Sequence, residues 1–211
     1  ENNGILFLRE LLQLHDENMD NELKLILQKT SLRPYYIYQG IYYLLGKEAI
    51  QYIEDQKGYI ISMDVFYDAV KGMPMGINKI IKFRWEMFLN KDKIVSETVE
   101  LILSTLYLFR ELSSDVIELL SLSKDVIASL HENMFLDINM DGNYCFDHDI
   151  LEAFFSSYYP NLELPVLKQI QKYRLIRKLK NYLFVYNLCR LNRSNFQFSI
   201  LKELHDTSLY V

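Results

Sequence analysis

Residues 137–148 read D-I-N-M-D-G-N-Y-C-F-D-H, and a fold for the whole chain can be inferred outward from this segment. Asp137, Asn139 and Asp141 place side-chain oxygens at every second position, and the glycine after them readily adopts the left-handed conformation of a tight turn. Alternating oxygen donors before a turn glycine are typical of loops that bind a hard cation such as Ca²⁺. His148 occupies the twelfth position, where such loops need a bidentate carboxylate. The segment therefore predicts a helix–loop–helix cation site whose last ligand has been replaced.

The same template recurs in weaker form elsewhere, so the chain contains an internal repeat. Residues 16–23, D-E-N-M-D-N-E-L, follow it most closely, with Asn21 in place of the turn glycine. Their ligand positions hold Asp16, Asn18 and Asp20. Residues 53–60 keep the glycine but place Lys57 where a cation would lie, and residues 88–94 are too short for a full loop. Neither of these last two loops is expected to bind metal.

Between and after these loops the chain carries three further runs. They read I-S-M-D-V-F-Y-D-A-V-K-G, then I-N-K-I-I-K-F-R-W-E-M-F-L-N-K-D-K-I, then S-E-T-V-E-L-I-L-S-T-L-Y. This region resembles the middle of neuronal calcium sensor and calcineurin B-like proteins of the EF-hand superfamily, which have a phenylalanine-bearing helix after the second loop and an Arg–Trp pair before the third. The resemblance covers roughly residues 5–160. It implies tandem paired EF-hand modules in two lobes, with very short strands between the loops.

The resemblance also implies ligand roles in loop 137–148. They fall on the side chains of Asp137, Asn139 and Asp141 and on the carbonyl of Asn143, with His148 in the last place. The implied cofactor is Ca²⁺, bound weakly at one site at most, because repulsion among the acidic side chains favours a cation even without the twelfth carboxylate. The competing interpretation is a metal-free loop held by Asx-type hydrogen bonds around its glycine.

The chain continues for about fifty residues beyond the four-module template. There Y-Y-P-N-L-E-L-P leads into a basic helix and then into the outline of a fifth, ligand-free EF-like module. This order is also similar to the regulatory B″ subunits of protein phosphatase 2A. We therefore expect an N-terminal EF-hand pair at 1–72, a second pair at 73–160 and a C-terminal EF-like extension at 161–211.

Hydrophobic periodicity predicts an all-α chain with only very short strands, at pieces such as 59–61 and 196–198. The predicted helices are 4–15, 22–30, 35–53, 63–71, 76–88, 96–111, 114–135, 148–157, 165–187 and 199–206. Half of the residues are apolar, yet no run approaches the roughly 20 apolar residues of a membrane helix. We expect a soluble, folded protein with no indication of membrane association. The two cysteines suit a reducing compartment, so a cytoplasmic location is predicted.

Enzymatic activity is not expected. Cys145, His148 and Asp149 lie close in sequence, but the cysteine falls on an expected strand while the histidine begins a helix, and no oxyanion hole is apparent nearby. The chain has no H-E-x-x-H, P-loop or G-x-G-x-x-G pattern and only seven glycines. A nucleotide-binding loop is therefore hard to place in it.

Charge and aromatic residues point to a protein partner. Residues 166–182 carry six basic side chains and no acidic one, although the chain as a whole has net charge −5. The acidic remainder would repel phosphate, so nucleic acid is not expected as a partner. The apolar residues of this basic helix recur at intervals of three or four, so it could lie in a groove of its own EF-hand lobes or serve as plain scaffold. Residues 35–45 carry tyrosines on more than one helical face, which a partner could cover.

These observations favour a regulatory or scaffold protein that binds an amphipathic helix of a partner through a hydrophobic groove, with most of its calcium sites lost. One alternative is a calcium sensor that acts through loop 137–148. The other is a phosphatase regulatory subunit of the B″ type. The sensor predicts a calcium-dependent change in shape or partner affinity, whereas the scaffold predicts none.

Overall fold

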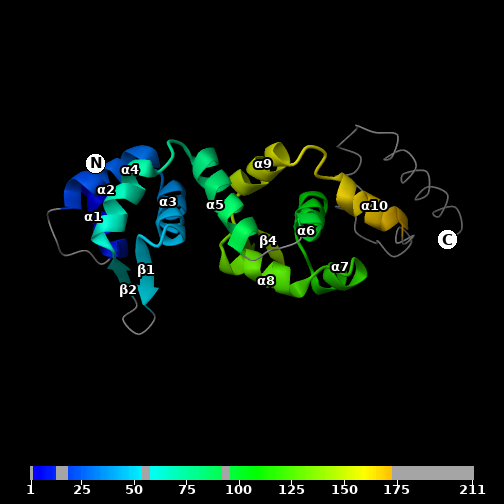
Figure 1. Ribbon diagram of the computed structural model, residues 1–211. Coiled ribbons are helices and arrows are strands. Elements are labelled where there is room, and N and C mark those ends of the chain that lie inside the picture. The colour runs from blue at the N-terminus through cyan, green and yellow to red at the C-terminus, as the bar shows by residue number, and fades with distance from the viewer. Residues whose placement is uncertain (1, 13–18, 54–57, 92–95, 173–211) are drawn as a thin grey trace, which may run out of the picture. The chain divides into compact units, whose positions relative to one another are not determined.

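The chain forms two compact units, which are described separately below (Figure 1). Unit 1 comprises residues 1–92 and unit 2 residues 93–211. The computed structural model describes residues 2–12, 19–53, 58–91 and 96–172. The elements of unit 1 are α1 (Asn2–Leu12), α2 (Asp20–Lys29), α3 (Pro34–Gly46), β1 (Ile50–Ile53), β2 (Gly58–Ile61), α4 (Met63–Gly72) and α5 (Ile77–Lys91). The elements of unit 2 are α6 (Ser96–Phe109), α7 (Ser114–Leu119), α8 (Lys124–Glu132), β3 (Leu136–Ile138), β4 (Tyr144–Phe146), α9 (Asp149–Tyr158) and α10 (Leu164–Lys172).

The core of unit 1 forms where α2 packs against α1, α3 and α4. Its fully buried side chains include Leu8, Leu12, Leu23, Ile26, Leu44 and Phe66. A buried lysine also joins α2 to the end of α4, because Lys29 Nζ donates hydrogen bonds to the carbonyl of Lys71 at 2.7 Å and to that of Met73. Carbonyls in the last turn of a helix have no partner within the helix, so this ammonium caps α4.

Helix α5 belongs to unit 1 because it packs along α3. The buried Arg84 donates a hydrogen bond to Gln39 Oε1, and its guanidinium lies 4.7 Å from the centre of the Tyr42 ring. Further along the same pair, Lys47 Nζ lies 4.5 Å from the centre of the Phe83 ring. We predicted a domain boundary after residue 72. Because α5 is part of unit 1, that compact unit extends to residue 92.

Unit 2 is built around α6, which contacts α8, α9 and α10. Val99, Ile102, Leu103 and Leu106 of α6 are fully buried, and they recur at the spacing of one helical face. Phe155 of α9 completes this core and packs edge-on against Phe135 at a ring separation of 6.1 Å.

Two of the predicted helices were too long. The segment 114–135 divides into α7 and α8, because Ser121 adopts a left-handed backbone conformation and Ser123 Oγ accepts a hydrogen bond from Val126 N as the N-cap of α8. The segment 35–53 ends as a helix at Gly46, and its last four residues form β1. In both places the apolar periodicity continues across a turn. The periodicity alone therefore predicted one long helix where the backbone turns.

The mostly helical fold is confirmed, but the strands pair differently from the prediction. We expected short strands to pair between loops, whereas β1 with β2 and β3 with β4 each form an antiparallel hairpin inside a single loop. The predicted strand at 59–61 lies within β2, while the strand at 196–198, the helix at 199–206 and the second half of helix 165–187 lie outside the described residues. None of the described helices is both long and apolar enough to cross a membrane.

Candidate functional site

The loop predicted to bind a cation is a β-hairpin between α8 and α9. Leu136 pairs with Phe146, Asp137 with Cys145 and Ile138 with Tyr144. The turn lies between the strands, where Gly142 N donates to the carbonyl of Asn139 at 3.0 Å, and the glycine has φ +77°. A turn that is followed by a left-handed glycine matches the three-residue hairpin loop that ends in a glycine bulge.

Asn139 holds this turn together. Its Oδ1 accepts hydrogen bonds from the backbone amides of Asp141 and Asn143, both at 3.0 Å. Its backbone amide donates to the carbonyl of Asn143 at 2.9 Å, and its Nδ2 donates to Glu111 Oε2 at 2.8 Å. These are the Asx-type bonds expected of the metal-free interpretation.

The remaining candidate ligands are placed as follows. Asp137 lies on β3, and its Oδ1 accepts a hydrogen bond from the Ile138 amide at 2.8 Å. His148 is the N-cap of α9, where its Nδ1 accepts a hydrogen bond from Ile150 N at 3.2 Å. Of the groups assigned to metal, the Asn139 oxygen and the Asn143 carbonyl are thus already engaged within the hairpin. These bonds close the loop without an ion, and Ca²⁺ binding at the same residues stays a prediction.

Within the described part of the chain, no group of three or more His, Cys, Asp or Glu side chains is arranged to hold a metal ion. Cys145 is half-buried beside the same hairpin. Burial raises the pKa of its thiol, and the nearby carboxylates of Asp137, Asp147 and Glu111 raise it further. This environment favours the protonated thiol over the thiolate, which is the reactive species of a nucleophilic cysteine.

The hairpin is also bonded to a second loop, which the sequence did not identify as its partner. Leu112 lies between α6 and α7, and its amide donates to the carbonyl of Tyr144 at 2.8 Å. The Tyr144 amide returns a hydrogen bond of 3.2 Å to the carbonyl of Leu112. Two helix–loop–helix segments, α6–α7 and α8–α9, are therefore joined through their loops. The template had pointed instead to residues 88–94, and the only sequence signal for loop 110–113 was the break between two predicted helices.

Helix α10 lies on α6 and is attached through both apolar and polar contacts. Val166, Leu167 and Ile170 are fully buried. Val166 N donates a hydrogen bond of 3.0 Å to Ser104 Oγ of α6, so a side chain of another helix caps the start of α10. Gln169 Nε2 donates at 3.0 Å to the carbonyl of Leu120, just after the end of α7. In residues 164–172 the apolar face of the basic helix therefore packs on α6, which both interpretations of this helix allow.

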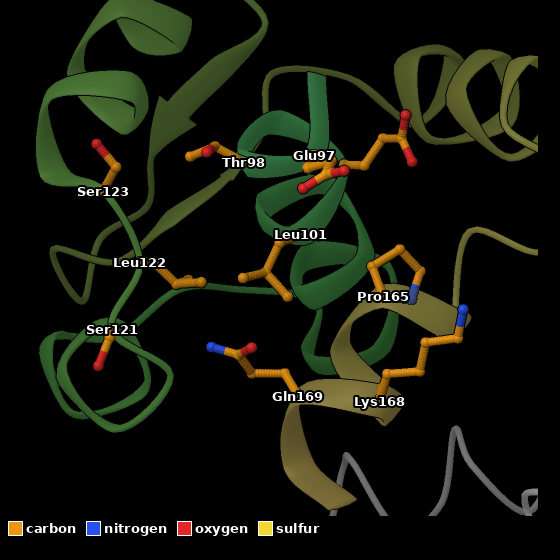
Figure 2. Close-up of a pocket in the computed structure, with 10 residues that line it drawn as sticks. Glu97, Thr98, Leu101, Ser121, Leu122, Ser123, Pro165, Lys168 and Gln169 are labelled. Carbon is orange, nitrogen blue, oxygen red and sulfur yellow. The ribbon is translucent and has the colours of Figure 1, made fainter. Parts of the chain in front are cut away.

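A cleft of about 620 Å³ adjoins α10. It is lined by Glu97, Thr98, Glu100 and Leu101 of α6, by Ser121, Leu122 and Ser123 of the α7–α8 linker, and by Pro165, Lys168 and Gln169 of α10. Figure 2 shows Leu101 and Leu122 pointing toward each other across it, with Gln169 beside them. The sequence did not reveal this cleft, because its three walls come from segments far apart in the chain.

The chain was compared with protein-family models, with curated proteins and with solved structures. None of the three comparisons returned a match.

Proposed function

We propose that this chain is a non-enzymatic regulatory or scaffold protein that binds an amphipathic helix of a partner protein, and that its helix–loop–helix segments are EF-hand-like modules. The observation that supports the proposal is the attachment of the chain's own amphipathic helix α10 to α6 through buried apolar side chains and two hydrogen bonds. Helix-in-groove recognition uses apolar anchors on one face of the bound helix, as Val166 and Ile170 provide here.

The reciprocal bonds between Leu112 and Tyr144 support the EF-hand-like part of the proposal. They join two helix–loop–helix segments loop to loop, which is the kind of pairing that the resemblance implies. The hydrogen bonds within hairpin 136–146 support the part of the proposal in which calcium sites have been lost. A loop closed by its own bonds holds one conformation without an ion, as a module that has lost its calcium site would.

Competition with α10 tests whether the surface binds a helix supplied from outside. The probe is a fluorescent peptide of residues 161–172, and the receptor is the full chain carrying Ile170→Asp. A charge at this buried position should detach the chain's own α10. In the wild type the tethered helix competes at an effective concentration of roughly millimolar, so the variant should bind the peptide at least about tenfold more tightly.

Two further variants make the result interpretable. Gln169→Ala removes only the bond to Leu120 and should give a smaller gain in peptide affinity. Ser157→Asp lies on the exposed surface of α9 and should bind the peptide as weakly as the wild type. If Ile170→Asp remains folded by circular dichroism and binds no peptide, the surface on α6 is not a helix-binding groove.

A further inference from the structure

Charges of opposite sign line the cleft beside α10, and they come from different helices. Glu97 and Glu100 lie on the first turns of α6, and Lys168 lies on α10. Figure 2 shows Glu97 and Lys168 on their separate helices. Among the residues that the structure describes, no ion pair joins Lys168 to either glutamate. Both signs of charge are therefore present in one cleft without neutralising each other.

The same cleft offers apolar contacts of small-molecule size. Leu101 of α6 and Leu122 of the α7–α8 linker point toward each other across it, and Pro165 adds the apolar start of α10 (Figure 2). The volume of about 620 Å³ falls within the range of about 300–1,000 Å³ typical of pockets for small ligands. A small molecule can therefore place an apolar side chain between the two leucines.

Neutral polar groups complete the lining. Three of them are the hydroxyls of Thr98, Ser121 and Ser123. Ser123 Oγ accepts a hydrogen bond from Val126 N, so its own hydrogen is left to donate. Gln169 Nε2 donates to the carbonyl of Leu120, which leaves the amide oxygen of that side chain as an acceptor. Hydroxyl donors and an amide acceptor suit the N–H and C=O groups of a peptide.

Simpler classes of ligand fit this lining less well. A small anion would meet the carboxylates of Glu97 and Glu100, and a small cation would meet the ammonium of Lys168. A purely apolar ligand would take these charges out of water without giving them a partner, which is costly. A molecule that carries an ammonium, a carboxylate and an apolar group offers a partner to each part of the lining.

We propose that this cleft binds a small zwitterion with an apolar side chain, that is, a free amino acid or a short peptide with unblocked ends. The ammonium of the ligand pairs with Glu97 and Glu100. Its carboxylate pairs with Lys168, and its apolar side chain enters between Leu101 and Leu122. The inference goes beyond the proposed function and is independent of it, because α10 stays in place as the wall that carries Lys168.

The test is a titration of leucyl-leucine into the full chain, followed by the amide chemical shifts in NMR spectra. Shift changes should appear at millimolar ligand and be confined to residues 97–101, 121–123 and 166–169. Acetylation of the amino end or amidation of the carboxyl end should each weaken binding by about two- to fivefold, the contribution of an exposed ion pair. Glycyl-glycine keeps both charges and should bind at least about tenfold more weakly, because it has no apolar side chain. Blocked peptides that bind as tightly as leucyl-leucine would show that the charges play no part.

Charge variants assign each end of the ligand. In Lys168→Met, amidation of the peptide should have no further effect, because the partner of the carboxylate is gone. In Glu97→Gln with Glu100→Gln, acetylation should have none for the same reason. The matched control, Lys79→Met with Glu118→Gln, removes one charge of each sign at exposed positions outside the cleft and should leave both effects unchanged. If blocking the ends costs as much in the cleft variants as in the control, these side chains do not hold the ligand.

A variant that narrows the cleft locates the binding. Thr98→Trp adds a bulky ring to the α6 wall and should remove the shift changes, whereas Thr98→Ser keeps the hydroxyl and should bind as the wild type does. Binding that survives Thr98→Trp, or a wild type that shows no shift changes at millimolar ligand, overturns the proposal. Free leucine identifies the source of the zwitterion. Affinity equal to that of leucyl-leucine supports an amino acid, and weaker affinity supports a short peptide.

Discussion

Ser104 Oγ accepts a hydrogen bond of 3.0 Å from the backbone amide of Val166, although the two residues are 62 positions apart. Ser104 is fully buried in the middle of α6, and Val166 is fully buried in the first turn of α10. The amide at the start of a helix has no partner within that helix, so the serine satisfies a buried donor that would otherwise lose its hydrogen bond. One side chain thus fixes where α10 begins on unit 2.

Replacing this serine should loosen α10. Ser104→Ala leaves the buried Val166 amide without its acceptor, which should lower the free energy of unfolding by about 1–2 kcal/mol. Urea denaturation measures the loss, and hydrogen exchange should show faster exchange of the Val166 amide. Ser156→Ala is the control, because the Ser156 hydroxyl is exposed and donates a hydrogen bond to the carbonyl of Ala153 within its own helix. Equal losses in the two variants would contradict the capping role.

The buried Lys29 should give a stability difference that depends on pH. Burial lowers the pKa of this amine below its ordinary value of 10.5. The unfolded chain therefore binds more protons than the folded chain between the lowered pKa and 10.5, so this residue adds stability as pH rises through that window. Lys29→Met should lower the free energy of unfolding by about 1–3 kcal/mol at neutral pH, because the carbonyls of Lys71 and Met73 lose a charged donor.

The measurement is urea denaturation of both proteins across the alkaline range. The advantage of the wild type over Lys29→Met should grow as pH rises toward 10.5. Burial raises the pKa of the Tyr43 and Tyr59 phenols, so these two residues lower the stability of the folded chain as pH rises. Both proteins contain them, so their effect cancels in the difference between wild type and Lys29→Met. An advantage that stays constant or shrinks with rising pH would show that the amine is not desolvated in the folded chain.

Calcium should bind weakly or not at all at loop 137–148. The Oδ1 of Asn139 already accepts two backbone hydrogen bonds, and His148 caps α9. Calorimetric titration of Ca²⁺ into chelator-treated protein should give a dissociation constant no tighter than about 10⁻⁴ M. Asp137→Ala should remove any heat that appears. Binding at micromolar ion, together with a calcium-dependent affinity for the peptide of residues 161–172, would make this chain a sensor instead.

The hairpin turn should require its glycine. Gly142 has φ +77°, and a Cβ there would meet no heavy atom within 4 Å, so only backbone strain opposes a larger residue. Gly142→Ala should lower the free energy of unfolding by about 1 kcal/mol, whereas Gly142→Asn should cost less, because asparagine tolerates the left-handed region. Thermal unfolding of the two variants measures the difference. If Gly142→Ala were at least as stable as Gly142→Asn, the left-handed conformation of the turn would be contradicted.

The sequence predicted features that depend on neighbouring residues. The break before α7 and the helical start at His148 both appear in the structure, because a cap is formed by residues only two or three positions apart. The N-x-D-G turn between alternating apolar residues was also a local hairpin signal, but it was interpreted as a cation loop or a metal-free Asx loop and not as a hairpin. The same residues suit both a cation loop and a hairpin, and in the structure the hydrogen bonds of Asn139 form the hairpin turn.

From its sequence alone this chain was determined to be mostly helical, acidic over most of its length and basic after residue 165, since periodicity and charge are properties of the residues themselves. Only the tertiary structure decided which loop joins hairpin 136–146, where α10 attaches and where the cleft lies. Leu112 meets Tyr144 through two reciprocal backbone hydrogen bonds, and the Val166 amide meets the side chain of Ser104 through one, and neither contact leaves a pattern in the chain. Such contacts form only when several helices bury their apolar faces together. They cannot be predicted from any short segment of the sequence.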